Sequence, residues 1–182
     1  EMPNDDPERL RARVHVDYPV RIDRVIGGLS GPGGPLPLSS YTLPCGVEVA
    51  TIAAAPPTLI GYFAHFAAQH GAADFLVDGD ERLSFAAVHA EAAKVARALV
   101  GGYGVKKGDR VGIAMRNAPS WVVLYMGTLM AGGVATLLNG WWQGGELCDG
   151  ITDVGAALVF ADPPRAQRVE ECGRETGFEI VL

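Results

Sequence analysis

Positively charged residues that could bind phosphate groups flank a short apolar segment of the sequence. Lys106-Lys107 precede this segment and Arg116 follows it, and both side-chain types bind phosphate oxygens. The same residues also fit a turn whose charges are solvated, because exposed charges gain little from pairing. We favour the solvated turn and keep phosphate binding as the alternative.

A glycine-rich segment, Gly27–Pro35, is a second candidate for phosphate binding. It contains neither the Gly-Lys-Ser/Thr of a phosphate-binding P-loop nor a complete GxGxxG. Glycine raises backbone entropy and proline removes a hydrogen-bond donor. We therefore expect a flexible turn with no regular element at this position.

The cysteines and histidines do not have the spacing of metal ligands. Cys45, Cys148 and Cys172 are far apart and odd in number, so we predict three free thiols in a reducing compartment and neither a zinc site nor a disulfide framework. The histidines are also scattered, and His65 and His70 are five residues apart where a helical metal pair is four apart. We predict no metal site.

Composition indicates a globular protein. The 182 residues are 48% hydrophobic and carry a net charge of −6, so no cationic surface is expected for a nucleic-acid backbone. The N-terminal residues lack the order of basic, apolar and small residues found in a signal peptide. We expect a soluble protein that binds no nucleic acid.

A long stretch without charge, from Asn117 to Gly145, either crosses a membrane or forms the interior of a parallel α/β sheet. Gly132-Gly133 divide it, and such a break inside a bilayer would leave backbone groups unpaired. The sheet interior is therefore favoured, and no membrane span is predicted. We expect a helix over Asn117–Ala131, capped by Asn117, then a buried strand.

Residues 1–57 and 58–182 differ in character, and we treat them as two domains. Residues 1–57 mix charges of both signs and include the glycine-rich turn and a loosely alternating segment, Tyr41–Ala53. They predict an irregular N-terminal extension with one or two short strands. Residues 58–182 carry regular helical and strand patterns.

The first elements of residues 58–182 are two helices with a hairpin between them. Thr58 and Ser84 each precede an apolar helical pattern and are expected to cap it. Asp78-Gly79 supply the positive φ that a tight hairpin turn needs. Gly101-Gly102 are expected to end the second helix.

Apolar strands then alternate with helices, which predicts right-handed βαβ units. The helices are expected over Asn117–Ala131, up to Gly155, and from a cap at Asp162. The fold class is therefore α/β: a parallel sheet with helices on both faces, plus an N-terminal β-hairpin element. The predicted strands are Val111–Met115, Val134–Leu138, Ala157–Phe160 and Phe178–Leu182.

The ordered segments resemble the adenylate-forming, AMP-binding enzymes, which include acyl-CoA synthetases, peptide-synthetase adenylation domains and luciferases. Leu83–Val88 resembles the core motif Leu-Thr-Tyr-x-Glu-Leu. Val105–Ile113 and Arg116–Trp121 are similar to the family's GV-x-x-GDRV and N-x-P-E-W segments. Met130–Asn139 resembles the next core motif. Asn139–Leu147 resembles the Asn-x-Trp-Trp-Thr-x-x-Glu-Leu of bacterial fatty-acid–CoA ligases.

This resemblance implies that residues 58–182 are the truncated first α/β subdomain of an AMP-binding domain. The parent would be a cytoplasmic ligase that uses ATP, Mg and CoA to convert a carboxylic acid into an acyl-adenylate and then an acyl-CoA thioester. The phosphate-binding loop and the catalytic lysine would lie, by resemblance, beyond Leu182. We therefore expect no catalytic residue in this chain, no cofactor bound to it, and no activity of the chain alone.

The resemblance also singles out Trp141 and Trp142. In the CoA ligases this loop can face the passage taken by CoA, where an aromatic ring could stack on adenine or line an acyl channel. The alternative, which we favour, is that both rings pack at the edge of the sheet. Gly132-Gly133 are expected to serve backbone geometry.

Two other function classes remain open. The chain could be a non-catalytic interaction or dimerisation module derived from this fold, since an incomplete parallel sheet exposes apolar surface. Its partner would then be a second copy, whereas in a ligase it would be the remainder of its own chain. A doubly wound nucleotide-binding domain is supported by fold analogy alone.

Overall fold

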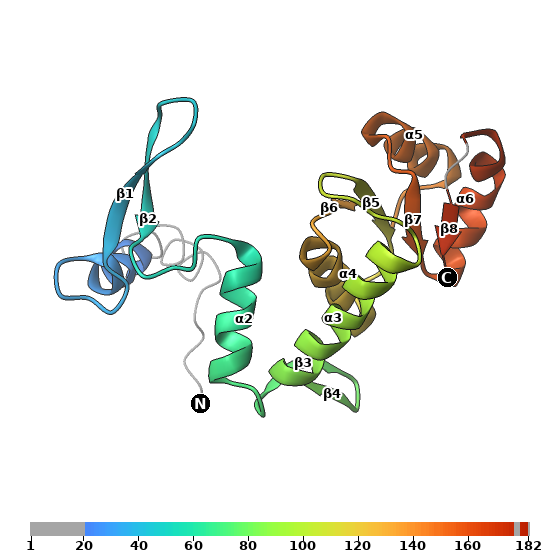
Figure 1. Ribbon diagram of the computed structural model, residues 1–182. Coiled ribbons are helices and arrows are strands. Elements are labelled where there is room, and N and C mark those ends of the chain that lie inside the picture. Colours follow the sequence, from blue (N-terminus) through green and yellow to red (C-terminus); the bar gives the residue numbers. More distant parts are fainter. Residues whose placement is uncertain (1–20, 177–178, 182) are drawn as a thin grey trace, which may run out of the picture. The chain divides into compact units, whose positions relative to one another are not determined.

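The computed structural model of the protein describes residues 21–176 and 179–181 (Figure 1). The chain divides into two compact units, Glu1–Pro57 and Thr58–Leu182. In the first unit, β1 (Leu38–Thr42) and β2 (Glu48–Ile52) form an antiparallel hairpin in which Tyr41 pairs with Val49. The alternating segment Tyr41–Ala53 therefore contains β2 and the end of β1, which begins three residues before the segment.

The glycine-rich segment of this unit is more regular than we expected. Residues 21–30 are helical, so the prediction of no regular element was wrong for its first four residues. The Ser30 hydroxyl donates to the Ile26 carbonyl at 2.7 Å and the Gly31 amide donates to the Gly27 carbonyl at 2.8 Å. Each glycine weakens a helix by about 1 kcal/mol but does not forbid it, and the prolines follow the last helical residue.

The second unit begins with two helices and a hairpin, all correctly expected. The Thr58 hydroxyl accepts a hydrogen bond from the Gly61 amide at 3.0 Å, and the Ser84 hydroxyl accepts one from the Ala87 amide at 3.2 Å. Gly79 turns the hairpin with a φ of 54°. The elements are α2 (Leu59–Gln69), β3 (Asp74–Asp78), β4 (Glu81–Ser84) and α3 (Phe85–Gly101).

A parallel sheet with the strand order β6-β5-β7-β8 forms the centre of this unit. Val111 of β5 pairs with Ala135 of β6 on one side and with Leu158 of β7 on the other. The predicted α/β class is confirmed, and the bounds of β5, β6 and β7 differ from the predicted ones by no more than one residue. The predicted ends of the last strand, Phe178 and Leu182, lie outside the described residues. The strands are β5 (Arg110–Ala114), β6 (Val134–Leu137), β7 (Leu158–Ala161) and β8 (Glu179–Val181).

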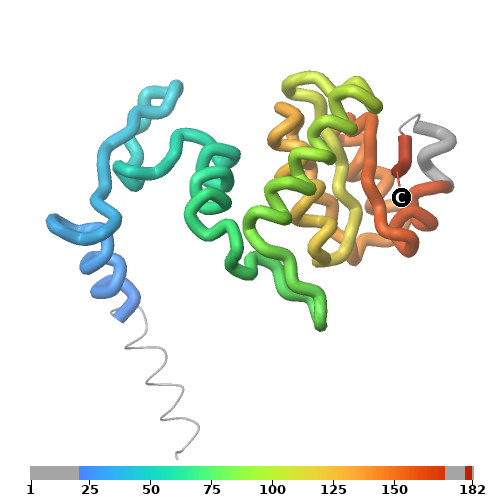
Figure 2. The backbone as a smooth tube through the Cα atoms, turned by 60° about the horizontal axis from the view of Figure 1, so that its bottom comes forward, coloured from blue at the N-terminus to red at the C-terminus, as the bar shows by residue number. Residues whose placement is uncertain are grey.

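Helices cover both faces of the sheet (Figure 2). On one face, Val111 and Leu158 pack with Leu99 of α3, and the helix α4 (Pro119–Met130) lies alongside α3. On the other face, Ala114 and Val159 pack against α5 (Gly144–Val154) and α6 (Pro163–Thr176). Successive side chains of a strand point to opposite faces, so β5, β7 and β8 each contribute to two hydrophobic clusters, one on each face of the sheet.

The helix α4 starts two residues later than predicted, and the cap assigned to Asn117 was wrong. Its N-cap is Ala118, whose side chain makes no capping hydrogen bond. Pro119 fixes the first helical position and forces the residue before it into extended backbone, with φ −158° and ψ 162° at Ala118. Asn117 is thereby one residue too early to cap.

After α4 the chain turns through Gly132, with a φ of 81°, into β6. The expected role of Gly132-Gly133 in backbone geometry is confirmed, because a side chain at Gly133 would also crowd the Thr128 methyl group at 3.1 Å. Within residues 21–176 and 179–181, the structure contains no helix with the length and apolar character needed to cross a bilayer.

The cysteines differ from the prediction of three free thiols, so they no longer support the predicted reducing compartment. Cys45 is free and exposed, but Cys148 on α5 is disulfide-bonded. The side chain of Cys172 lies outside the described residues. Spacing in the sequence could not predict this bond, because a disulfide depends on which side chains the fold brings together.

Candidate functional site

Three loops meet where the parallel strands end, at what we call the carboxyl edge of the sheet. Residues 115–118 follow β5 and lead to α4 on one face, whereas residues 138–143 follow β6 and lead to α5 on the other face. Asp162 follows β7 and precedes α6. In open α/β sheets, ligands bind outside the carboxyl ends of adjacent strands whose connections leave toward opposite faces.

A cleft of about 310 Å³ lies at this edge, between the loops after β5 and β6. Residues 115–117 and Trp121 line one wall, and residues 137–141 line the other. We call it the Trp141 cleft. It combines apolar surface with one guanidinium, the side chain of Arg116.

Trp141 is the most exposed large hydrophobic residue in the described part of the chain, with 72% of its surface accessible. Its backbone amide donates to the Asn139 side-chain oxygen at 3.0 Å, which fixes the turn after β6. The Arg116 guanidinium carbon lies 5.1 Å from the centroid of its ring. An exposed cation–π contact of this kind contributes about 0.5–1 kcal/mol, so the two walls of the cleft touch through these side chains.

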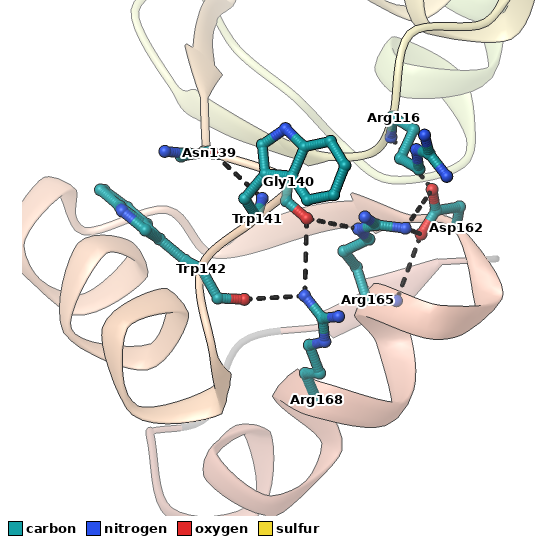
Figure 3. A network of polar contacts seen from close by, with 8 residues as sticks. All are labelled: Arg116, Asn139, Gly140, Trp141, Trp142, Asp162, Arg165 and Arg168. Atoms are coloured by element: carbon teal, nitrogen blue, oxygen red, sulfur yellow. Dashed lines mark hydrogen bonds and ion pairs between the residues drawn. The ribbon is translucent and has the colours of Figure 1, made fainter.

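Trp142 points away from the cleft (Figure 3). Its half-buried ring packs against the cluster beneath α5. A Cβ atom at Gly150 would lie 2.7 Å from its Cζ3 atom, so the glycine leaves the space that the ring fills. The two adjacent tryptophans therefore have different surroundings: Trp141 faces solvent and Trp142 anchors the loop to α5.

An arginine–aspartate network at the start of α6 connects the loops that follow β5 and β6 (Figure 3). Arg165 is only 5% exposed; its Nε donates to the Gly140 carbonyl at 2.7 Å and its Nη1 lies 3.4 Å from both Asp162 carboxylate oxygens. Asp162 Oδ2 also accepts from the Arg116 amide at 3.0 Å. Arg168 Nη1 donates to the Trp142 carbonyl at 2.9 Å.

The structure separates the cations considered as phosphate contacts. Arg116 lies at the carboxyl edge, in the Trp141 cleft. Lys106-Lys107 are exposed and precede β5, at the opposite edge of the sheet. There Asp109 Oδ2 accepts from the Lys106 amide at 2.8 Å, which makes this segment a closed turn of the kind that we favoured.

Sequence reasoning missed Arg165 and Arg168. Asp162 was expected to cap α6, and its Oδ1 does accept from the Arg165 amide at 3.2 Å. The spacing of Asp162, Arg165 and Arg168 by three residues each places their side chains along one helix face, and this was the available signal. Among the described residues, no group of three His, Cys, Asp or Glu side chains is arranged to hold a metal ion.

Comparison with known families decides what kind of protein carries this cleft. The family model described as AMP-binding enzyme matches residues 63–181. The chain belongs to the AMP-binding family. The resemblance inferred from the ordered motifs is thereby confirmed.

Curated relatives of this family member include fatty-acid–CoA ligases. It is 34% identical over 111 residues to the medium/long-chain-fatty-acid–CoA ligase FadD6 of Mycobacterium tuberculosis, which covers 61% of this chain and 18% of that protein. It is 28% identical over 125 residues to the long-chain-fatty-acid–CoA ligase of Salmonella typhimurium, covering 69% and 22%. The chain thus spans less than a quarter of the length of these relatives.

Solved structures show the same fold. A benzoate CoA ligase from Burkholderia xenovorans LB400 superposes with a TM-score of 0.63 at 20% identity, over 66% of this chain and 24% of that one. The N-terminal domain of FACL13 from Mycobacterium tuberculosis superposes with a TM-score of 0.58 at 27% identity, over 62% and 29%. The expected N-terminal fold of adenylate-forming enzymes is therefore confirmed.

Proposed function

We propose that this chain is the N-terminal part of a cytoplasmic, ATP-dependent acid–CoA ligase. The observation that carries the proposal is the AMP-binding family match over residues 63–181, together with relatives that are fatty-acid–CoA ligases. The parent activates a carboxylate with Mg-ATP. The carboxylate oxygen bonds to the α-phosphate, pyrophosphate leaves, and the CoA sulfur then displaces AMP to form the thioester.

Within that parent, the loop with Trp141 and Trp142 borders the passage taken by CoA or the acyl chain. Trp141 supplies an open aromatic face, on which a planar base can stack. Arg116, 5.1 Å from that ring, supplies a guanidinium for phosphate oxygens. Trp142 contributes indirectly, because its packing on α5 fixes the loop that carries Trp141.

The chain alone does not catalyse adenylation. Charge balance on the transferring phosphoryl group requires several positioned cations and a metal, and the motifs that supply them in the family are absent from this sequence. The test is release of pyrophosphate by the purified 182-residue chain with ATP, Mg and fatty or aryl acids. A full-length acyl-CoA synthetase serves as the positive control. Turnover by the pure chain above the no-enzyme rate would overturn this part of the proposal.

An interaction module is the second candidate, and the exposed outer side of strand β6 favours it. Val134 and Leu137 on the edge strand β6 are 48% and 51% exposed, and among the described residues β6 pairs with β5 alone. Open edges with apolar side chains promote association between chains. In a ligase, the remainder of the same chain would cover this edge. Sedimentation at several concentrations separates the two: a concentration-dependent dimer supports the module, and a monomer throughout contradicts it.

A further inference from the structure

Both walls of the Trp141 cleft are attached to the first turn of α6. The wall after β5 is attached through the Arg116 amide, which donates to Asp162 Oδ2 at 3.0 Å. The wall after β6 is attached through the Gly140 carbonyl, which accepts from Arg165 Nε at 2.7 Å. Asp162 and Arg165 are themselves paired at 3.4 Å. One ion pair therefore bridges the two loops that form the cleft.

Packing alone does not explain an arginine at this position. Arg165 is 5% exposed, and a buried ion pair is often no more stabilising than apolar residues of the same volume. What an arginine adds is a rigid fork of donors that can hold two acceptors at a fixed distance. Here the two acceptors are the Gly140 carbonyl and the Asp162 carboxylate.

The Asp162 carboxylate likewise uses both of its oxygens as hydrogen-bond acceptors. Its Oδ1 accepts the Arg165 amide at the start of α6 at 3.2 Å, and its Oδ2 accepts the Arg116 amide. An asparagine has one acceptor oxygen and would lose one of these two bonds. Between the walls, a Cβ atom on Gly140 would lie 3.0 Å from the Met115 carbonyl, so the backbones already lie in close contact and a small shift of either loop changes the cleft.

We propose that the Asp162–Arg165 pair sets the width of the Trp141 cleft, with Arg165 as a positioning residue that keeps Trp141 and Arg116 stacked across it. The role as a positioning residue for ligand binding rests on the proposed function, whereas the effect on the cleft's geometry does not. Arg168 supports the same loop by donating to the Trp142 carbonyl. Removing the pair should therefore separate Trp141 from Arg116 without unfolding the sheet.

Nuclear magnetic resonance of the ¹⁵N-labelled 182-residue chain tests this geometry. The readouts are hydrogen exchange of the Arg116 amide and the resonance of the Trp141 indole N–H, assigned by its loss in Trp141→Phe. In Asp162→Ala, which removes both acceptor oxygens, we expect Arg116 exchange to become about tenfold faster, as for the loss of one hydrogen bond. In Arg165→Lys we expect the Trp141 indole resonance to move, because a lysine cannot hold both acceptors. Arg97→Lys, an exposed arginine on α3, is the matched control and should change neither.

Unchanged Arg116 exchange and an unchanged Trp141 resonance in both folded variants would overturn the proposal. Loss of folding in both variants would also overturn it, because the pair would then serve stability. Titration with CoA tests the positioning role separately. The chain alone is expected to bind no CoA, and if no resonance of the wild type moves, the two variants decide the cleft geometry by themselves. If CoA moves the Trp141 resonance equally in wild type and Arg165→Lys, the positioning role fails and the passage stands.

Discussion

Gly127 on α4 is the point at which the second unit should be least tolerant of an added methyl group. A Cβ atom there would lie 2.6 Å from Val95 Cγ1 and 2.9 Å from the carbonyl oxygen of Ala92, both on α3. Ala92 is fully buried, and a valine in a helix has essentially one rotamer. Neither neighbour can move aside without shifting one helix against the other.

The expected cost of Gly127→Ala follows from two opposing effects. Alanine gains about 1 kcal/mol over glycine in helix propensity, whereas overpacking of a tight core costs about 1–3 kcal/mol. Since the clash involves backbone and a stiff side chain, we take about 3 kcal/mol as the cost of overpacking. After the gain of about 1 kcal/mol in helix propensity is subtracted, the free energy of unfolding should fall by about 2 kcal/mol. For a chain of this size, that corresponds to a melting temperature lower by about 4–8 °C.

Urea unfolding followed by tryptophan fluorescence measures this change, and Trp121 at the start of α4 reports on the same helix. Gly101→Ala is the matched control, because a Cβ atom at this exposed end of α3 would have no described atom within 4 Å. It should be neutral or slightly stabilising.

Val95→Ala should restore part of the stability of Gly127→Ala, as a favourable coupling in a double-mutant cycle. A Gly127→Ala variant as stable as the wild type would refute the close packing of α3 on α4.

Three further changes test the local interactions. Thr128→Val should raise the free energy of unfolding by about 1 kcal/mol, because the fully buried Thr128 hydroxyl has no hydrogen-bond partner in the described part of the chain; a lower thermal midpoint than wild type would contradict this. Gly150→Ala should move the Trp142 indole resonance, since its Cβ atom would lie 2.7 Å from the ring, whereas Gly145→Ala on the same helix meets open space and should not. Ser84→Ala should lower stability by about 1 kcal/mol through loss of the cap on the Ala87 amide, and Ser84→Asp should restore it in urea unfolding.

Local signals predicted most of the second unit. Thr58, Ser84 and Gly79 act within three residues of their own positions, so short-range chemistry decides them. The start of α4 was missed because two local rules competed. Asparagine is a good cap, but Pro119 fixes the first helical position and makes the residue before it the N-cap.

The candidate site was predictable only in part. The sequence singled out Trp141 and Trp142, but it could not indicate which ring faces the cleft. Side chains in a loop do not alternate between faces with a regular repeat, as those in a helix or a strand do. That choice depends on the space left by Gly150 on α5. Arg165 was missed because an arginine in the first turns of a polar helix is usually solvated. Its burial arises from contacts with Gly140, which lies far from it in sequence.

The order of the strands has a consequence for how the sheet assembles. Both Ala135 and Leu158 pair with Val111, but Leu158 is about twice as far from it along the chain. Loop closure over twice the length costs about 0.6 kcal/mol more, so we expect β5 and β6 to associate before β7 and α6 arrive. During synthesis from the N-terminus, the Trp141 and Arg116 loops would then be neighbours before the ion pair of α6 exists. The cleft would be formed loosely first and tightened when α6 docks.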